Sequence, residues 1–128
     1  MGLMKLYTGS FRDFVKYRDK YTVVAISTGV PKWYKDKRYK KLAPPYSLMS
    51  QYRYCCDCDE TDVEMYIQQY CDTVLNPLTP LEVFQELENM SDGKDVILLT
   101  QESSDEFSHR HLVSAWFNNA GIECREFI

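Results

Sequence analysis

The chain has 128 residues and a net charge of −4, and this length is typical of one domain. It is 45% hydrophobic, 14% aromatic and 27% charged, with five glycines and five prolines, which excludes a disordered or collagen-like chain. Its longest aliphatic runs, Val23–Ile26 and Val96–Leu99, have four residues each, whereas a membrane span needs roughly 20. We therefore expect a single domain over residues 1–128 and no membrane association.

The charge is divided unevenly along the chain. Residues 1–50 carry a net charge of +8, and residues 51–128 carry −12. Much of the positive charge lies in residues 32–41, where basic residues are interleaved with Trp33 and two tyrosines. Such a segment suits a nucleic acid, because cations pair with phosphates and rings stack on bases. Charge runs of this kind more often belong to a solvated loop, which here would offset the charge of the acidic half.

The five cysteines favour a reducing compartment. Their number is odd and two are adjacent, which makes a poor disulfide framework, so we expect a cytoplasmic protein. Cys55 and Cys58 form a C-x-x-C pair, which is half of a zinc site, but a second pair of ligands is missing. Motifs for redox cofactors are also missing. We expect no metal and no cofactor, with Cys55–Cys58 in a solvent-reachable loop.

The first half of the chain predicts two strands and a long loop. Lys5–Thr8 is expected to be the first strand, followed by a turn at Gly9–Ser10 in which Ser10 caps a short helix. The β-branched run Thr22–Ser27 predicts the second strand. Residues 28–45 lack apolar periodicity and end in two prolines, which indicates a long functional loop. A short helix is expected over residues 47–53.

The second half predicts three helices and two strands. Asp62–Leu75 keeps the i, i+3, i+4 spacing of one buried helical stripe. Thr79–Glu82 has the pattern of a capping box that opens a helix reaching Met90. Val96–Thr100 is apolar on both faces, as a central strand should be. The last expected elements are a helix over His109–Ala120, ended by Gly121, and a strand over Ile122–Phe127.

Strands that alternate with helices predict a small Rossmann-like α/β sandwich of three layers with a mainly parallel sheet. In such sheets, ligands bind beyond the carboxyl ends of the strands. Three predicted loops lie at that edge, namely Gly9–Arg12, Thr28–Lys41 and Gln101–Arg110.

The third of these loops carries the main candidate site. With Ser108 as the N-cap, His109 and Arg110 occupy the first helical turn, where unpaired N–H groups and the helix dipole favour an anion. The guanidinium can fork onto a phosphate or a carboxylate. Glu102 would accept a ribose hydroxyl or act as a general base. In the alternative interpretation, Ser108 is only a cap, and Glu102 and Arg110 pair with each other.

Several motifs together resemble one family. They are Ala25-Ile26-Ser27 through Pro31, Leu42-Ala43-Pro44-Pro45, the helix Tyr66–Leu75, Leu98-Leu99 through Glu102, Phe107, His109–Val113 and Trp116. This set is similar to the domain-of-unknown-function 488 family over nearly the whole chain. The resemblance implies a small Rossmann-like domain with its site at the His-Arg-His helix start, but no particular reaction. The family usually has cysteine where this chain has Thr100 and Ser108, so a thiol-dependent mechanism does not carry over.

Two functions follow from these residues. The first is binding of a nucleotide or nucleotide-like phosphate at the carboxyl edge, with hydrolysis of a glycosidic or phosphoester bond as the natural chemistry. Glu102 and His109 are its candidate catalytic residues, and its candidate ligand contacts are Ser10, Arg12, Ser27, Lys32, Trp33, Lys41, Ser108, Arg110 and His111. The alternative is a non-catalytic interaction protein, of the kind carried by phages or other mobile elements, that engages nucleic acid or an acidic host protein through residues 32–41.

Overall fold

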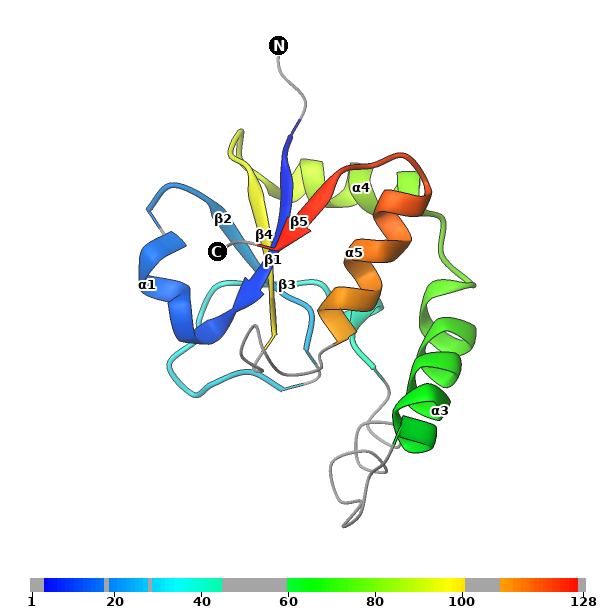
Figure 1. The fold of residues 1–128 in the computed structure, drawn as a ribbon. Helices are drawn as coiled ribbons and strands as arrows, with labels where there is room; N and C mark the ends of the chain where they lie inside the picture. The colour runs from blue at the N-terminus through cyan, green and yellow to red at the C-terminus, as the bar shows by residue number, and fades with distance from the viewer. Residues whose placement is uncertain (1–3, 18, 28, 45–59, 101–108, 127–128) are drawn as a thin grey trace.

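A five-stranded sheet forms the centre of the molecule (Figure 1). The computed structural model describes residues 4–17, 19–27, 29–44, 60–100 and 109–126. The strands are β1 (Leu6–Ser10), β2 (Thr22–Ala25), β3 (Lys37–Arg38), β4 (Val96–Thr100) and β5 (Cys124–Glu126), in the spatial order β3-β2-β4-β1-β5. Every neighbouring pair is parallel. The central strand β4 is buried throughout, as its apolar sequence predicts. The predicted Rossmann-like α/β sandwich is confirmed.

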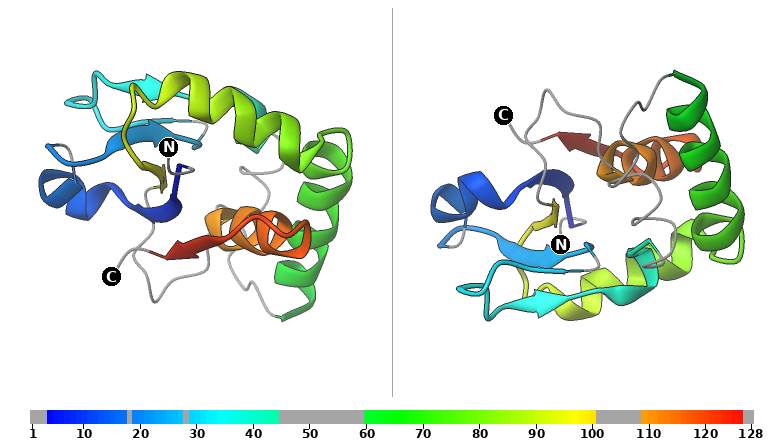
Figure 2. Two further views of the ribbon diagram at one scale, coloured as in Figure 1. Left: turned by 90° about the horizontal axis from the view of Figure 1, so that it is seen from above. Right: turned by 90° about the horizontal axis from the view of Figure 1, so that it is seen from below.

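The helices cover the two faces of the sheet unequally. The α-helices are α1 (Phe14–Tyr17), α3 (Glu60–Tyr70), α4 (Pro80–Met90) and α5 (His109–Asn119), and shorter helical turns are η1 (Phe11–Asp13), η2 (Lys40–Leu42) and the π-helical η3 (Cys71–Leu75). Figure 2 shows α3, α4 and α5 on one side of the sheet and α1 on the other. The outer layers are therefore a three-helix layer and a thinner layer built on α1.

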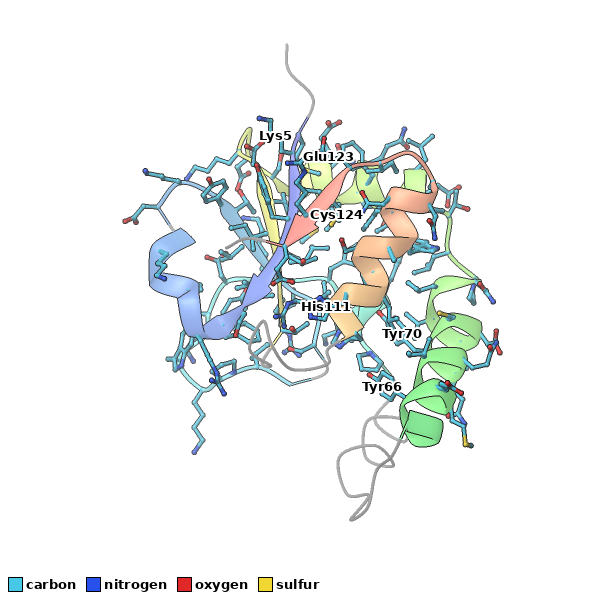
Figure 3. The ribbon with its side chains drawn as sticks, viewed as in Figure 1. Lys5, Tyr66, Tyr70, His111, Glu123 and Cys124 are labelled. Atoms are coloured by element: carbon cyan, nitrogen blue, oxygen red, sulfur yellow. The ribbon has the colours of Figure 1, made fainter. Side chains whose placement is uncertain are left out.

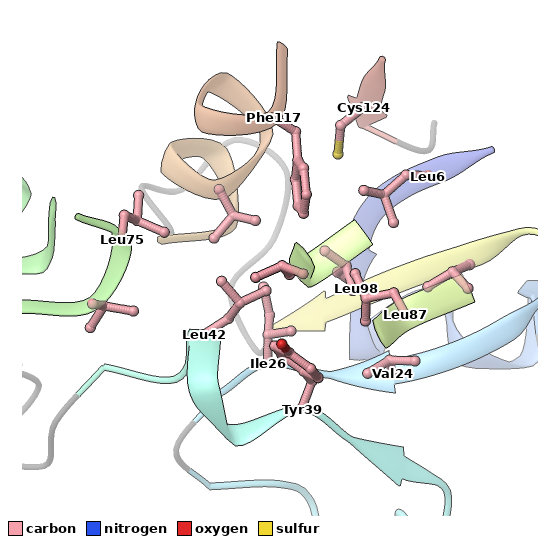
Figure 4. Close-up of a cluster of buried hydrophobic side chains, with 14 of the residues drawn as sticks. Leu6, Val24, Ile26, Tyr39, Leu42, Leu75, Leu87, Leu98, Phe117 and Cys124 are labelled. Atoms are coloured by element: carbon pink, nitrogen blue, oxygen red, sulfur yellow. The ribbon is translucent and has the colours of Figure 1, made fainter. Parts of the chain in front are cut away.

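The larger core lies between the sheet and the three-helix layer. Because side chains alternate along a strand, Leu6, Val24 and Leu98 all point to this side, where they pack with Leu87 of α4 and Phe117 of α5 (Figure 4). All five side chains are almost completely buried. This core fixes the position of α5 against the sheet.

A smaller, aromatic core lies on the opposite face. Ile97 and Leu99 of β4 point to this side and pack with Phe11 and Tyr34. Burial there raises the pKa of Tyr34 well above its ordinary value. Among the residues that the structure describes, this face is thus covered by the short α1 and by residues 30–34.

Three predictions for the first half need correction. Gly9–Ser10 is not a turn but the end of β1, because these residues pair with Leu99 and Thr100 of β4. Residues 28–45 are not purely loop, because they contain β3 and η2. Several residues of this segment are also buried, namely Tyr34, Tyr39, Leu42 and Pro44. The second strand ends at Ala25 rather than Ser27. The helix expected over residues 47–53 and the Cys55–Cys58 segment lie outside the described residues.

The predicted helices of the second half are confirmed, with one difference in capping. The stripe over residues 62–75 forms α3 and continues through η3. Thr79 is the extended N-cap of α4 and Pro80 follows at N1, but the Thr79 side chain makes no capping hydrogen bond. Gly121 follows α5 with a φ of +83°, as a C′ glycine should.

In the part of the chain that the structure describes, no helix combines the length and the apolar character of a membrane span. The same residues contain no cluster of metal-ligating side chains. The closing strand is shorter than predicted, covering Cys124–Glu126.

Cys124 gives a test of the larger core. Burial raises the pKa of its thiol to about 12, so the folded protein keeps a proton that an unfolded cysteine loses near its ordinary pKa of about 8.5. The contribution of this proton to the free energy of unfolding is complete below the ordinary pKa. It is lost as the pH rises toward the pKa of the thiol in the folded protein. Urea denaturation of the parent and of Cys124→Ala should show the parent losing about 1.5 kcal/mol relative to the variant between about pH 8 and about pH 10. Identical pH profiles would contradict this burial.

Candidate functional site

The sheet becomes polar toward its carboxyl edge on the side that faces α5. Thr8, Thr100 and Glu126 each follow an apolar core residue two positions earlier in their strands, and therefore point to the same side. Thr8 is paired with Glu126 in the register of β1 and β5. The alternation of the strands thus brings two hydroxyls and a carboxylate to one place.

Arg110 enters this place from the first turn of α5. Its side chain is completely buried, and Nε lies 3.0 Å from Oε1 and 3.2 Å from Oε2 of Glu126. Its Nη1 donates to Oγ1 of Thr100 at 2.5 Å. A cation near a helix N-terminus opposes the helix dipole, and a buried charge needs an opposite charge. The carboxylate of Glu126 offsets the unfavourable helix dipole and is the opposite charge that the buried guanidinium needs. Glu126 is the carboxylate partner that the described residues show, and Glu102 lies outside those residues.

His111 is the solvent-facing member of the same group. Its Nδ1 lies 3.3 Å from Oε2 of Glu126, and 37% of its side chain is exposed, against 21% for Glu126. The same Oε2 accepts a hydrogen bond from Oγ1 of Thr8 at 3.2 Å. Figure 3 shows His111 at the start of α5, at the carboxyl edge of the sheet. We call Thr8, Thr100, Arg110, His111 and Glu126 the edge cluster.

His109, a candidate catalytic residue, lies inside the fold. It is almost completely buried, and its Nε2 lies 2.9 Å from the carbonyl oxygen of Ile26. Because a carbonyl only accepts, this nitrogen carries the proton of that hydrogen bond. The ring also packs on Tyr70 of α3, with centroids 5.4 Å apart, and the Tyr70 hydroxyl donates to the carbonyl of Leu42 at 2.6 Å. His109 therefore connects α5 to the end of β2 and to α3.

Two predicted serines serve local turns. Ser10 Oγ accepts from the backbone N–H of Arg12 at 3.2 Å, which confirms Ser10 as an N-cap, although of the 3₁₀ turn η1. Ser27 Oγ donates to the carbonyl of Gly29 at 2.5 Å. Both serines are buried near the carboxyl edge, whereas the Arg12 side chain is exposed.

The predicted contacts from the long loop are engaged by other elements. Trp33 is 53% exposed and packs against Phe14 of α1, with ring centroids 4.9 Å apart, in the layer on the opposite face of the sheet from Arg110. Lys41 makes an ion pair of 2.9 Å with Glu86 of α4. Lys32 is exposed. The structure therefore gathers Arg110 and His111 but holds Trp33 and Lys41 against α1 and α4.

The sequence interpretation missed three members of the edge cluster. The sequence does contain a pattern that could have indicated them. Each is the polar residue that ends an alternating apolar pattern in its strand, namely Thr8, Thr100 and Glu126. Two residues of the predicted site, Glu102 and Ser108, lie outside the described residues.

One comparison with known proteins decides the family. A family model described as the active DUF488-N3 subclade matches residues 15–121. The chain belongs to this family. No curated protein and no solved structure matches the chain. The match spans Thr100, Arg110 and His111 of this DUF488-N3 member, whereas Thr8 and Glu126 lie outside the matched range.

Proposed function

We propose that this DUF488-N3 member binds a nucleotide or nucleotide-like phosphate at the carboxyl edge of its sheet and hydrolyses a glycosidic or phosphoester bond there. One observation carries the proposal. A completely buried guanidinium, that of Arg110, is fixed by Glu126 and Thr100 where α5 begins, with His111 beside it and open to solvent. Buried ionic groups that converge at the ligand-binding edge of a parallel sheet are typical of functional sites.

The helix start supports an anionic ligand. The first N–H groups of α5 have no acceptor within the helix, and the dipole adds partial positive charge there. Arg110, already paired with Glu126, contributes to the site by holding the cluster in place.

Binding is tested by calorimetric titration of the purified protein with AMP and with adenosine. Since the phosphate supplies the anion, we expect AMP to bind at least about tenfold more tightly than adenosine, which corresponds to about 1.4 kcal/mol. Denaturing mass spectrometry of freshly purified protein shows whether a nucleotide co-purifies. Equal affinities for the two compounds, or no binding of either at millimolar concentration, would exclude the proposed phosphate site.

Trp33 favours a second candidate function, the binding of single-stranded nucleic acid by the basic aromatic loop. It is the most exposed ring of an aromatic group in which it contacts Phe11 and Phe14, and it lies beside the exposed Lys32. An exposed ring next to cations suits base stacking. Against this, Lys37 pairs with Asp92, which favours the interpretation of the run as a charge-offsetting loop.

Joint replacement of Lys37, Arg38, Lys40 and Lys41 by glutamine separates these interpretations. Stability should change little, because exposed charges and surface ion pairs typically contribute less than about 0.5 to 1 kcal/mol each. If the loop binds nucleic acid, fluorescence anisotropy with a single-stranded oligonucleotide will show salt-sensitive binding by the parent and its loss in the variant. Trp33→Ala, which keeps all the charges, should weaken binding through lost stacking. A parent without salt-dependent binding would remove this candidate.

A further inference from the structure

We propose that His111 is the general base of a phosphoester hydrolysis, with Glu126 orienting its ring and Arg110 positioning Glu126. This inference rests on the proposed function and names its reaction class. It starts from the 3.3 Å contact between His111 Nδ1 and Glu126 Oε2. A carboxylate only accepts hydrogen bonds, so this ion-pair contact favours the tautomer of a neutral His111 ring that has its proton on Nδ1. The nitrogen left to accept a proton is then Nε2.

Glu126 is held too firmly to act as the base itself. Oε1 and Oε2 both lie within 3.2 Å of Arg110 Nε, and Oε2 also accepts from the Thr8 hydroxyl. Charge-assisted hydrogen bonds of this kind fix the carboxylate and engage its lone pairs. A fixed carboxylate beside an imidazole is the arrangement that sets the tautomer and orientation of a catalytic histidine. Glu126 is therefore a positioning residue, and so is Arg110.

The pairing of Glu126 with Arg110 also favours a phosphoester over a glycosidic bond as the substrate. Glycoside hydrolysis usually uses two carboxyl groups, one as an acid and one as a nucleophile or base. In the part of the edge that the structure describes, the carboxylate beside His111 is Glu126, which Arg110 already neutralises. An imidazole base next to a positive helix start instead suits attack of water on a phosphate, where binding and charge stabilisation supply most of the catalysis.

In the proposed step, water attacks the phosphorus atom of the ester. His111 Nε2 accepts a proton from water while the water oxygen forms a bond to phosphorus. The bond between phosphorus and the leaving oxygen breaks, and that oxygen keeps the electron pair. The imidazolium proton then passes to the leaving group, which regenerates neutral His111.

Kinetics with the 4-nitrophenyl ester of thymidine 5′-monophosphate tests this role, and thymidine 5′-monophosphate reports binding separately. We expect His111→Gln to lower kcat by at least about 100-fold with the affinity for thymidine 5′-monophosphate unchanged, because general-base catalysis contributes about 10²- to 10⁴-fold. Glu126→Gln should lower kcat less, by about tenfold or more, since it removes only the orienting charge. Glu123→Gln is the matched control, because this exposed carboxylate precedes the same strand, and it should keep the parental rate.

Nitrogen-15 NMR of the histidine rings gives a second, substrate-free readout. We expect the parent to show the Nδ1–H tautomer at His111 when the ring is neutral, and Glu126→Gln to lose that preference while Glu123→Gln keeps it. An Nε2–H tautomer in the parent would overturn the proposal, as would a His111→Gln variant with parental kcat.

The remaining outcomes separate this inference from the proposed function. If the parent binds thymidine 5′-monophosphate but cleaves neither the ester nor 4-nitrophenyl phosphate, the general base is wrong and nucleotide binding stands. If the parent binds no nucleotide, the proposed function fails, and the base fails with it.

Discussion

Arg110→Met is expected to lower the free energy of unfolding by about 3 kcal/mol. The substitution keeps much of the aliphatic packing but removes the positive partner of Glu126 and a donor to Thr100. Breaking a buried ion pair typically costs about 3 to 5 kcal/mol, because one charge remains without its partner. We expect the lower end of that range, since Glu126 is partly exposed and water can reach it. For a domain of this size the expected loss in Tm is about 10 °C, measured by calorimetry.

The double variant Arg110→Met/Glu126→Gln identifies the cause of that loss. Removing the carboxylate charge as well should recover about 1 to 2 kcal/mol relative to Arg110→Met, which is the coupling expected of residues in contact. Arg125→Met is the matched control, because Arg125 lies on the same strand as Glu126 but is largely exposed, and its stability should stay within about 0.5 kcal/mol of the parent. A stable Arg110→Met protein would show that the pair with Glu126 does not hold the edge cluster.

Phe117→Ala is expected to have a comparable or larger effect, about 3 to 5 kcal/mol. Phe117 is completely buried between α5 and the sheet, next to Leu6 and Cys124 (Figure 4). Its removal leaves a cavity that well-packed neighbours fill only in part. Chemical denaturation should show the loss, and Asn119→Ala, an exposed change at the end of the same helix, should cost less than about 0.5 kcal/mol. A cost below about 1 kcal/mol for Phe117→Ala would mean that α5 does not pack on the sheet as described.

The sequence predicts the parts of this fold in which apolar residues follow a regular pattern along the chain. The apolar run of β4 and the stripe of α5 are continuous, so the central position of β4 and the position of the Arg110 turn follow from them. The long loop over residues 28–45 is different. Tyr34 and Tyr39 are each buried against a different element, and no periodic pattern of apolar residues in the sequence indicates their burial.

The edge cluster is predictable only in part for a related reason. Arg110 requires a compensating carboxylate, and the sequence offers Glu102 as the nearer choice. Glu102 lies outside the described residues, and the structure places Glu126 beside Arg110, because β5 pairs with β1 and carries that side chain to the carboxyl edge. A contact set by strand order in the sheet cannot be read from the spacing of charges along the chain.

The position of β1 also has a consequence for how the chain folds. Leu6 lies between Val96 of β4 and Cys124 of β5, so the first strand finds both of its neighbours near the other end of the described chain. Such a high contact order slows folding, since long loops must close before these pairings form. During synthesis, β1 must therefore wait for β4, and Arg110 leaves the ribosome before Glu126. The buried ion pair can form only after β5 has been synthesised, so the edge cluster cannot assemble before that strand is available.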